Sequence, residues 1–369
     1  MAPSASTTTS ASVATATATL LAVLRGASAA TGGLRGLGAS ATTWEGRGLC
    51  GLATDMLDTN DHSMRTYCNM HLGFWWNWDH KPKIAYLSPC STETFTPMIW
   101  GLSAGHQNQA FASSVPQTRL MGYNEPDLWG PPAIPGGNYL SSGTFAPTFQ
   151  CGNDELARDW QALVLAFKAK SPDGLVVSPA MADADPAGTA SAGDYSQCNI
   201  SPQTNENHLP YCGGWLKCFK ESVSRFQCGE NTNCWEVIDV LQFHAYEYTS
   251  ENLIKKVKTW ETTWAEDLSG ANGAKPKSLW LTEFARAGAT DSSDPDGKTA
   301  AFMDESIAYM KASSVVSGWS WFSQDTTTFA SFTIGDLPAA SPFWASDLIN
   351  ANGDATVIGE HYASLCQGL

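Results

Sequence analysis

Eight short apolar runs recur along the chain, most of them separated by segments with helical spacing. Unbroken apolar runs are typical of strands that are buried on both faces of a parallel sheet. We expect such strands at 46–52, 71–78, 95–100, 120–127, 175–180, 237–246, 278–284 and 315–322. Eight strand–helix units in one chain favour an α/β fold, a single (β/α)8 TIM barrel, over a doubly wound sheet.

Helical periodicity is clearest over 154–170, where Leu156 and Trp160 begin an apolar face. Further helices are expected at 252–268 and 298–312. Each follows one of the expected strands, as a strand–helix repeat requires.

The chain has ten cysteines, and five of them fall within 198–234. Their even number and the absence of a C-x-x-C pair favour disulfides and an oxidising compartment over a zinc or thioredoxin-like site. Residues 182–234, between the fifth and sixth expected strands, are too many for an ordinary strand-to-helix connection. We therefore predict a Cys-rich, disulfide-stapled insertion there, with a helix near 215–226.

The first residues read as a targeting segment. Residues 20–24 are a brief apolar core, and 27–29 resemble a small-residue cleavage site. We predict a signal peptide over 1–30, a linker over 31–43 and one barrel domain over 44–369. A secreted or cell-wall protein is expected; import into an organelle is the alternative, because the segment is rich in hydroxyl groups and free of acids.

The charge of the chain excludes several classes of partner. The formal net charge is −15 and the pI is about 4.8. Nucleic acids and anionic membranes attract lysine and arginine, so neither is expected as a partner. Fifteen tryptophans are present, and flat aromatic faces suit the stacking of sugars, although most tryptophans pack in the core. We expect a monomer that meets a neutral polymer.

Polar and aromatic side chains gather at the ends of the expected strands. They are Asn77, Asn124, Glu125, His244, Tyr246, Glu283 and Trp321. In a barrel the carboxyl ends of all strands face one mouth, so these side chains should converge. The predicted site is therefore a pair of carboxylates surrounded by amide, imidazole and aromatic groups.

Two carboxylates across such a mouth fit glycoside hydrolysis. One acid protonates the leaving oxygen, and the other attacks or stabilises the oxocarbenium-like centre. Strands four and seven lie close enough for direct attack by Glu125 or Glu283, which predicts retention of configuration. Asn124 is suited to bind the sugar 2-hydroxyl, and His244 or Tyr246 to hold Glu283 in position. No metal-ligand pattern or phosphate loop occurs, so no cofactor is expected.

Five segments in order resemble glycoside hydrolase family 128. They are 74–78 (FWWNW), 95–101 (FTPMIWG), 122–127 (GYNEPD), 280–285 (WLTEFA) and 319–322 (WSWF), followed by a similar closing segment over 346–362. The resemblance implies a clan A barrel that cleaves β-1,3-glucan with retention. It implies Glu125 as acid/base and Glu283 as nucleophile. Ala245 departs from the family, which commonly has a bulky aromatic residue at that place.

The resemblance also implies contacts to the glucan from Asn77 and the neighbourhood of Trp75, Trp76 and Trp321. Because side chains alternate along a strand, about half of the tryptophans near the strand ends are expected in the core.

Several alternatives remain open at this point. Internal cleavage of β-1,3-glucan is the leading hypothesis. The same carboxylates would serve a β-1,4-glucan or mannan, and a non-catalytic glycan-binding barrel is a third possibility. Glu125 could also be a solvated turn residue, and Glu283 could form a structural ion pair with Arg286.

Overall fold

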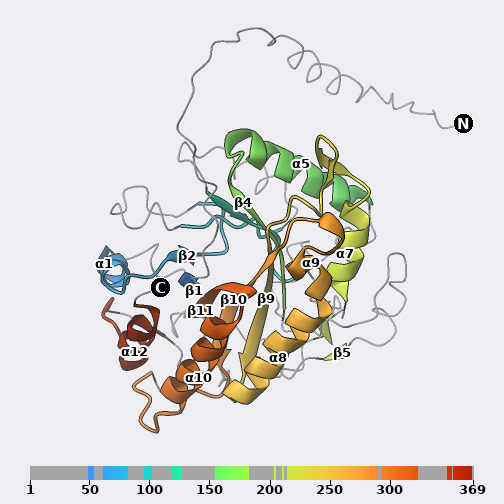
Figure 1. Cartoon of the computed structure of the whole chain (residues 1–369). Coiled ribbons are helices and arrows are strands. Elements are labelled where there is room, and N and C mark those ends of the chain that lie inside the picture. The colour runs from blue at the N-terminus through green and yellow to red at the C-terminus, as the bar shows by residue number, and fades with distance from the viewer. Residues whose placement is uncertain are drawn as a thin grey trace, which may run out of the picture. The chain divides into compact units, whose positions relative to one another are not determined.

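The computed structural model describes residues 49–53, 61–81, 95–101, 118–126, 154–182, 203–204, 210–211, 214–289, 292–322, 347–350 and 352–367 (Figure 1). The chain divides into two compact units, Met1–Glu45 and Gly46–Leu369, and all described residues belong to the second. The predicted signal peptide and linker lie outside the described residues. In the described part, no helix combines the length and apolarity needed to cross a bilayer.

A seven-stranded sheet in the order β2-β1-β11-β10-β9-β4-β3 forms the centre of the fold. Every neighbouring pair of strands in it is parallel, as the unbroken apolar runs predict. The strands are β1 (Leu49–Ala53), β2 (Phe74–Trp76), β3 (Arg119–Met121), β4 (Leu175–Met181), β9 (Val240–Glu247), β10 (Ser278–Arg286) and β11 (Val316–Phe322). Figure 1 shows α8 and α10 running beside β9, β10 and β11.

The two edge strands of this sheet, β2 and β3, are joined by the segment predicted as the third strand. Thr96 N donates to Trp75 O on one side, at 2.9 Å, and Ile99 N donates to Met121 O on the other, at 3.1 Å. The segment forms isolated β-bridges to its neighbours and no continuous ladder. Pro97 contributes to this, because it has no N–H to donate. This seam makes the curled sheet consistent with a TIM-like barrel.

Two helices have the bounds that periodicity predicts, α5 (Asp154–Lys170) and α10 (Lys298–Ala312). The segment predicted as one helix over 252–268 is two, α8 (Ser250–Thr263) and α9 (Ala265–Ser269), with Trp264 outside helical geometry between them. The described residues also form the helices α1 (Asp61–Asn69), α7 (Trp215–Val223) and α12 (Val357–Cys366). A short 3-10 turn, η3, covers Ala271–Gly273, and small hairpins pair β5 (Gln203–Thr204) with β6 (Pro210–Tyr211) and β7 (Gln227–Gly229) with β8 (Thr232–Asn233).

The predicted Cys-rich insertion over 182–234 is not confirmed. Its described second half contributes to the helical layer, because α7 packs on α5 and β4. The rings of Trp215 and Phe219 stack at 5.1 Å, and Phe219 meets Trp160 of α5 edge-on at 5.4 Å. Within its described residues Cys228 is bonded to Cys234, and Cys218 is disulfide-bonded as well. Residues 183–202 lie outside the described part.

Another disulfide joins the first described strand to the last described helix. Cys50 on β1 is bonded to Cys366 on α12, across 316 positions of sequence. Beside it, the hydroxyl of Tyr362 donates to Gly51 O at 2.9 Å. All cysteines within the described ranges are disulfide-bonded, as the even count predicts.

Candidate active site

Glu125 lies just beyond β3, where the chain turns sharply. Its backbone is in the left-handed region, with φ of 45°, and its N–H donates to Ala180 O at 2.8 Å. Ala180 N in turn donates to Tyr123 O at 2.7 Å. A non-glycine residue in this region carries strain that surrounding structure must offset. The two backbone hydrogen bonds to β4 hold the turn, and the carboxylate remains 16% exposed.

Glu283 lies on β10 at an irregularity of the sheet. The register between β9 and β10 shifts between Leu281 and Glu283, so that Glu283 stands opposite His244. Such bulges re-aim side chains and are common beside active sites. The side chain of Glu283 is 4% exposed. Arg286, its ion-pair partner in the alternative interpretation, donates to Thr299.

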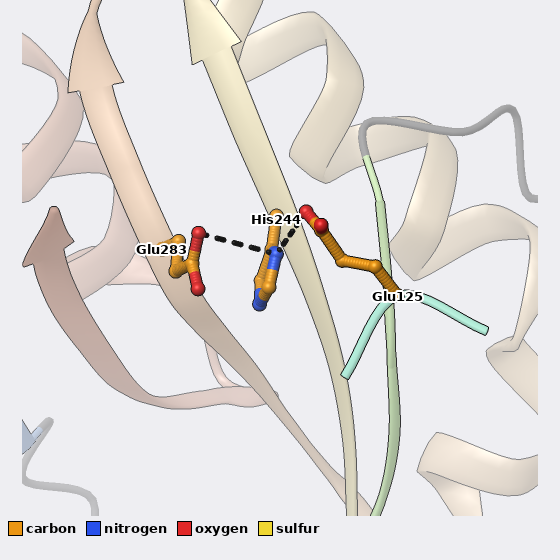
Figure 2. A group of neighbouring side chains, drawn as sticks. All are labelled: Glu125, His244 and Glu283. Carbon is orange, nitrogen blue, oxygen red and sulfur yellow. Dashed lines mark hydrogen bonds and ion pairs between the residues drawn. The ribbon is translucent and has the colours of Figure 1, made fainter. Parts of the chain in front are cut away.

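His244 lies between the two carboxylates (Figure 2). Its Nδ1 is 2.8 Å from Glu125 Oε1 and 3.4 Å from Glu283 Oε2. One ligand atom from each of the three side chains lies within 4.8 Å of the others. Glu125 follows β3, whereas His244 and Glu283 lie within β9 and β10, which continue for three residues beyond them; the three side chains converge as predicted.

Among the described residues, Glu125, His244 and Glu283 are the group of potential metal ligands whose side chains are close enough to share an ion. The 2.8 Å contact between His244 and Glu125 is a hydrogen bond, with a proton between the two atoms whichever group carries it. A cation would have to displace that proton. The hydrogen bond makes His244 and Glu125 a pair that can exchange a proton.

Glu283 receives a separate donor on each oxygen. The hydroxyl of Tyr246 donates to Oε2, as predicted for a residue that positions this carboxylate. The indole N–H of Trp78 donates to Oε1 at 2.8 Å. The strand-end pattern did not single out Trp78, because its backbone turns into the left-handed region, with φ of 57°, beyond the end of β2.

Burial raises the pKa of Glu283 to about 7 from an ordinary value of 4.5. His244 lowers this pKa, the nearby Glu125 raises it, and the hydrogen bonds from Tyr246 and Trp78 lower it. Desolvation disfavours the charged carboxylate and so outweighs the donors. Because the two carboxylates interact at short range, the pair is expected to lose its protons in two macroscopic steps.

Replacing Glu283 with glutamine should stabilise the fold at pH 8 by up to about 3 kcal/mol and have little effect at pH 4. The native state binds an extra proton between the unfolded pKa of 4.5 and the folded value of about 7. Wild-type stability therefore falls as the pH rises through this window, and the neutral glutamine escapes the loss. Urea unfolding at pH 4 and pH 8 measures the free energy of unfolding of both proteins. An equal difference between variant and wild type at the two pH values would contradict the prediction.

The two predicted asparagines occupy different environments. Asn124 is 3% exposed, and its Oδ1 has no hydrogen-bond partner among the described residues. A buried polar atom without a partner is uncommon and suits a group that awaits a ligand. Asn77 instead serves its own loop, where its amide donates to Lys81 O at 3.3 Å and its Oδ1 accepts from Asp79 N at 3.2 Å.

The three predicted tryptophans are all fully buried. Trp76 stacks beside His244, with ring centroids 6.3 Å apart, and donates to Ser320 Oγ at 3.1 Å. Trp75 points to the helical layer, against Tyr67 of α1. Trp321 packs among Phe284, Phe302 and Tyr362. Strand alternation thus places Trp76 beside the site, while the glucan contacts of all three stay a prediction.

Comparisons with known proteins agree with this architecture. A family model described as "Glycosyl hydrolase catalytic core" matches residues 51–362. A search of curated proteins finds no match.

Three solved structures of glycoside hydrolase family 128 share the fold. One is an exo-β-1,3-glucanase (subgroup V) from Cryptococcus neoformans, with 18% identity over 86% of this chain and 99% of that one, and a TM-score of 0.51. Another exo-β-1,3-glucanase (subgroup VI), from Aureobasidium namibiae, has 16% identity, 86% and 96% coverage and a TM-score of 0.53. An endo-β-1,3-glucanase (subgroup IV) from Lentinula edodes has 12% identity, 85% and 98% coverage and a TM-score of 0.53. Since the family model spans most of the sequence and the fold is that of family 128, the chain belongs to the glycosyl hydrolase catalytic core family.

Proposed function

We propose that the protein is a retaining glycoside hydrolase that cleaves β-1,3-glucan within the chain. The observation that carries the proposal is the short separation of Glu125 and Glu283, whose nearest oxygens lie within 4.8 Å. Retaining enzymes keep their carboxyl groups about 5–5.5 Å apart, whereas inverting enzymes need roughly 6.5–9.5 Å for a water molecule. The β-1,3-glucanases with the same fold support the choice of polymer.

In the first step, Glu283 attacks the anomeric carbon while Glu125 gives its proton to the leaving oxygen. Glu283 is the buried carboxylate with two donors fixed on it, as a nucleophile in a defined orientation needs. Glu125 is the more exposed of the two, so leaving group and water can reach it. In the second step, Glu125 takes a proton from water, which attacks the glycosyl-enzyme from the opposite face.

His244 couples the two roles. Its Nδ1 is 2.8 Å from Glu125 and 3.4 Å from Glu283. The imidazole is therefore close enough to both carboxylates to respond to a change of charge on either one. Asn124, with its unsatisfied Oδ1, accepts a hydrogen bond from the sugar 2-hydroxyl in this proposal.

Incubation with a linear β-1,3-glucan, followed by NMR of the fresh products and their separation by length, tests the proposal. We expect β-anomers at the new reducing ends and a spread of oligosaccharide lengths. Glu125→Gln is the inactive control, and β-1,4-glucan and mannan are the competing substrates. Release of a single short product from chain ends would refute internal cleavage. Fresh α-anomers would refute retention, and binding without turnover by wild type would favour a glycan-binding barrel.

A further inference from the structure

Trp78 gives Glu283 a hydrogen bond from a group that can only donate. Its indole Nε1 donates to Glu283 Oε1 at 2.8 Å, while Tyr246 donates to the other oxygen, Oε2. An indole N–H can only donate a hydrogen bond, whereas a phenol hydroxyl can donate or accept. Therefore only Oε2 can carry a proton and keep its neighbour as a partner, with the hydroxyl turned to accept.

The backbone of Trp78 is strained to make this contact. Its φ of 57° lies in the left-handed region, which is unfavourable for a bulky residue. Glu125 is also in this region, so one carboxylate of the pair and a residue bonded to the other both lie on strained backbone. Strain of this kind persists only where the surrounding structure fixes it, and it clusters at active sites.

Aromatic packing holds the ring of Trp78 in place. It meets Trp76 edge-on at 4.9 Å and Phe322 edge-on at 5.9 Å. Phe322 also packs edge-on against Tyr246 at 5.3 Å. One phenyl ring at the end of β11 thus supports both donors to Glu283.

We propose that Trp78 is a positioning residue, which fixes Glu283 Oε1 as a permanent acceptor and directs the proton of the neutral acid to Oε2. The oxygen that exchanges protons then faces His244 and, through it, Glu125. The kinetic part of this inference rests on the proposed hydrolysis, but the hydrogen bond and its titration do not.

The charge balance at Glu283 makes the contact measurable. Burial and Glu125 raise its pKa, whereas His244 and the hydrogen bonds from Tyr246 and Trp78 lower it. Since Trp78 favours the ionised form, its N–H proton should respond when Glu283 is protonated.

The first experiment follows the indole N–H signals of protein labelled with 15N-tryptophan as the pH is varied. One signal, assigned by its loss in Trp78→Phe, should shift with a midpoint near the Glu283 pKa of about 7. This shift should vanish in Glu283→Gln. No turnover is needed, so an inactive protein whose indole signal titrates would refute the proposed function alone. A Trp78 signal that does not titrate, or that titrates equally in Glu283→Gln, would overturn the inference.

The second experiment compares Trp78→Phe with wild type on β-1,3-glucan. The substitution keeps an aromatic ring and removes the hydrogen-bond donor, so we expect kcat to fall roughly 10–100-fold. The acid limb of the pH–rate profile should move up by about one pH unit, because Glu283 loses a donor that favours its ionised form. Trp264→Phe is the matched control, because its Nε1 is buried without a hydrogen-bond partner among the described residues. It should leave the acid limb unchanged. An unmoved acid limb in Trp78→Phe would overturn the inference. If that variant does not fold, the test is whether any indole signal titrates near pH 7 in wild type and not in Glu283→Gln; the absence of such a signal would overturn the inference.

Discussion

Replacing Glu283 with alanine should lower hydrolysis of β-1,3-glucan on the order of 10⁴-fold or more, and azide should restore turnover. Without the nucleophile, a small anion can enter the space left by the buried carboxylate and attack the anomeric carbon directly. An aryl β-glycoside of a laminari-oligosaccharide should then give an α-glycosyl azide. The configuration of this azide, read by NMR, identifies the residue that was removed.

Glu125→Ala is the matched variant. Its loss on the polymer should be about 10²–10⁴-fold, the usual contribution of a general acid. With an activated leaving group, the glycosyl-enzyme on Glu283 still forms, and azide should attack it to give a β-glycosyl azide. If the two variants gave the opposite anomers, the roles assigned to Glu125 and Glu283 would be exchanged. If neither were rescued nor impaired, the carboxylate pair would not be the catalytic machinery.

Removing the Cys50–Cys366 disulfide by alanine substitution at both positions should lower the free energy of unfolding by about 5 kcal/mol. The bond spans 316 positions of sequence and ties β1 to α12. In the chain-entropy account, a cross-link that closes a long loop restricts the unfolded chain more than one that closes a short loop. Urea unfolding monitored by tryptophan fluorescence measures the difference.

The Cys228–Cys234 disulfide supplies the control. It joins residues only six positions apart, so its removal should cost about 2 kcal/mol by the same reasoning. Both bonds are buried, so the packing lost with the sulfur atoms is similar. Equal losses for the two bonds would show that loop length does not govern their contributions.

Sequence periodicity predicted the regular parts of the fold because burial determines them. The apolar faces of α5 and α10 end where the helices end. The apolar runs of β4, β9, β10 and β11 are buried on both faces, which leaves little freedom in their placement. The convergence of Glu125 and Glu283 followed from the common direction of parallel strands.

Features that depend on backbone irregularity were not predictable in the same way. The bulge that sets Glu283 opposite His244 has no compositional signal, so the closer contact of His244 with Glu125 could not be foreseen. Nothing in the pattern showed that Trp78 would turn back to Glu283. The break at Trp264 and the bridged third strand likewise depend on tertiary packing, which overrides local propensity.

Residues 95–100, which bridge β2 and β3, imply that the curled sheet is less stable on this side than between its other strands. The other neighbouring strands share ladders, some of them with bulges, whereas the described residues of this side are joined by isolated bridges. Such places open locally at lower free energy than the ladders of the core, and their amide hydrogens exchange sooner with solvent. The seam reaches Asp79 O, next to Trp78, and Trp100 O, which accepts from Asn124 beside Glu125. Local opening there would therefore reach the backbone beside Trp78 and beside Glu125 while β9 and β10 stay paired.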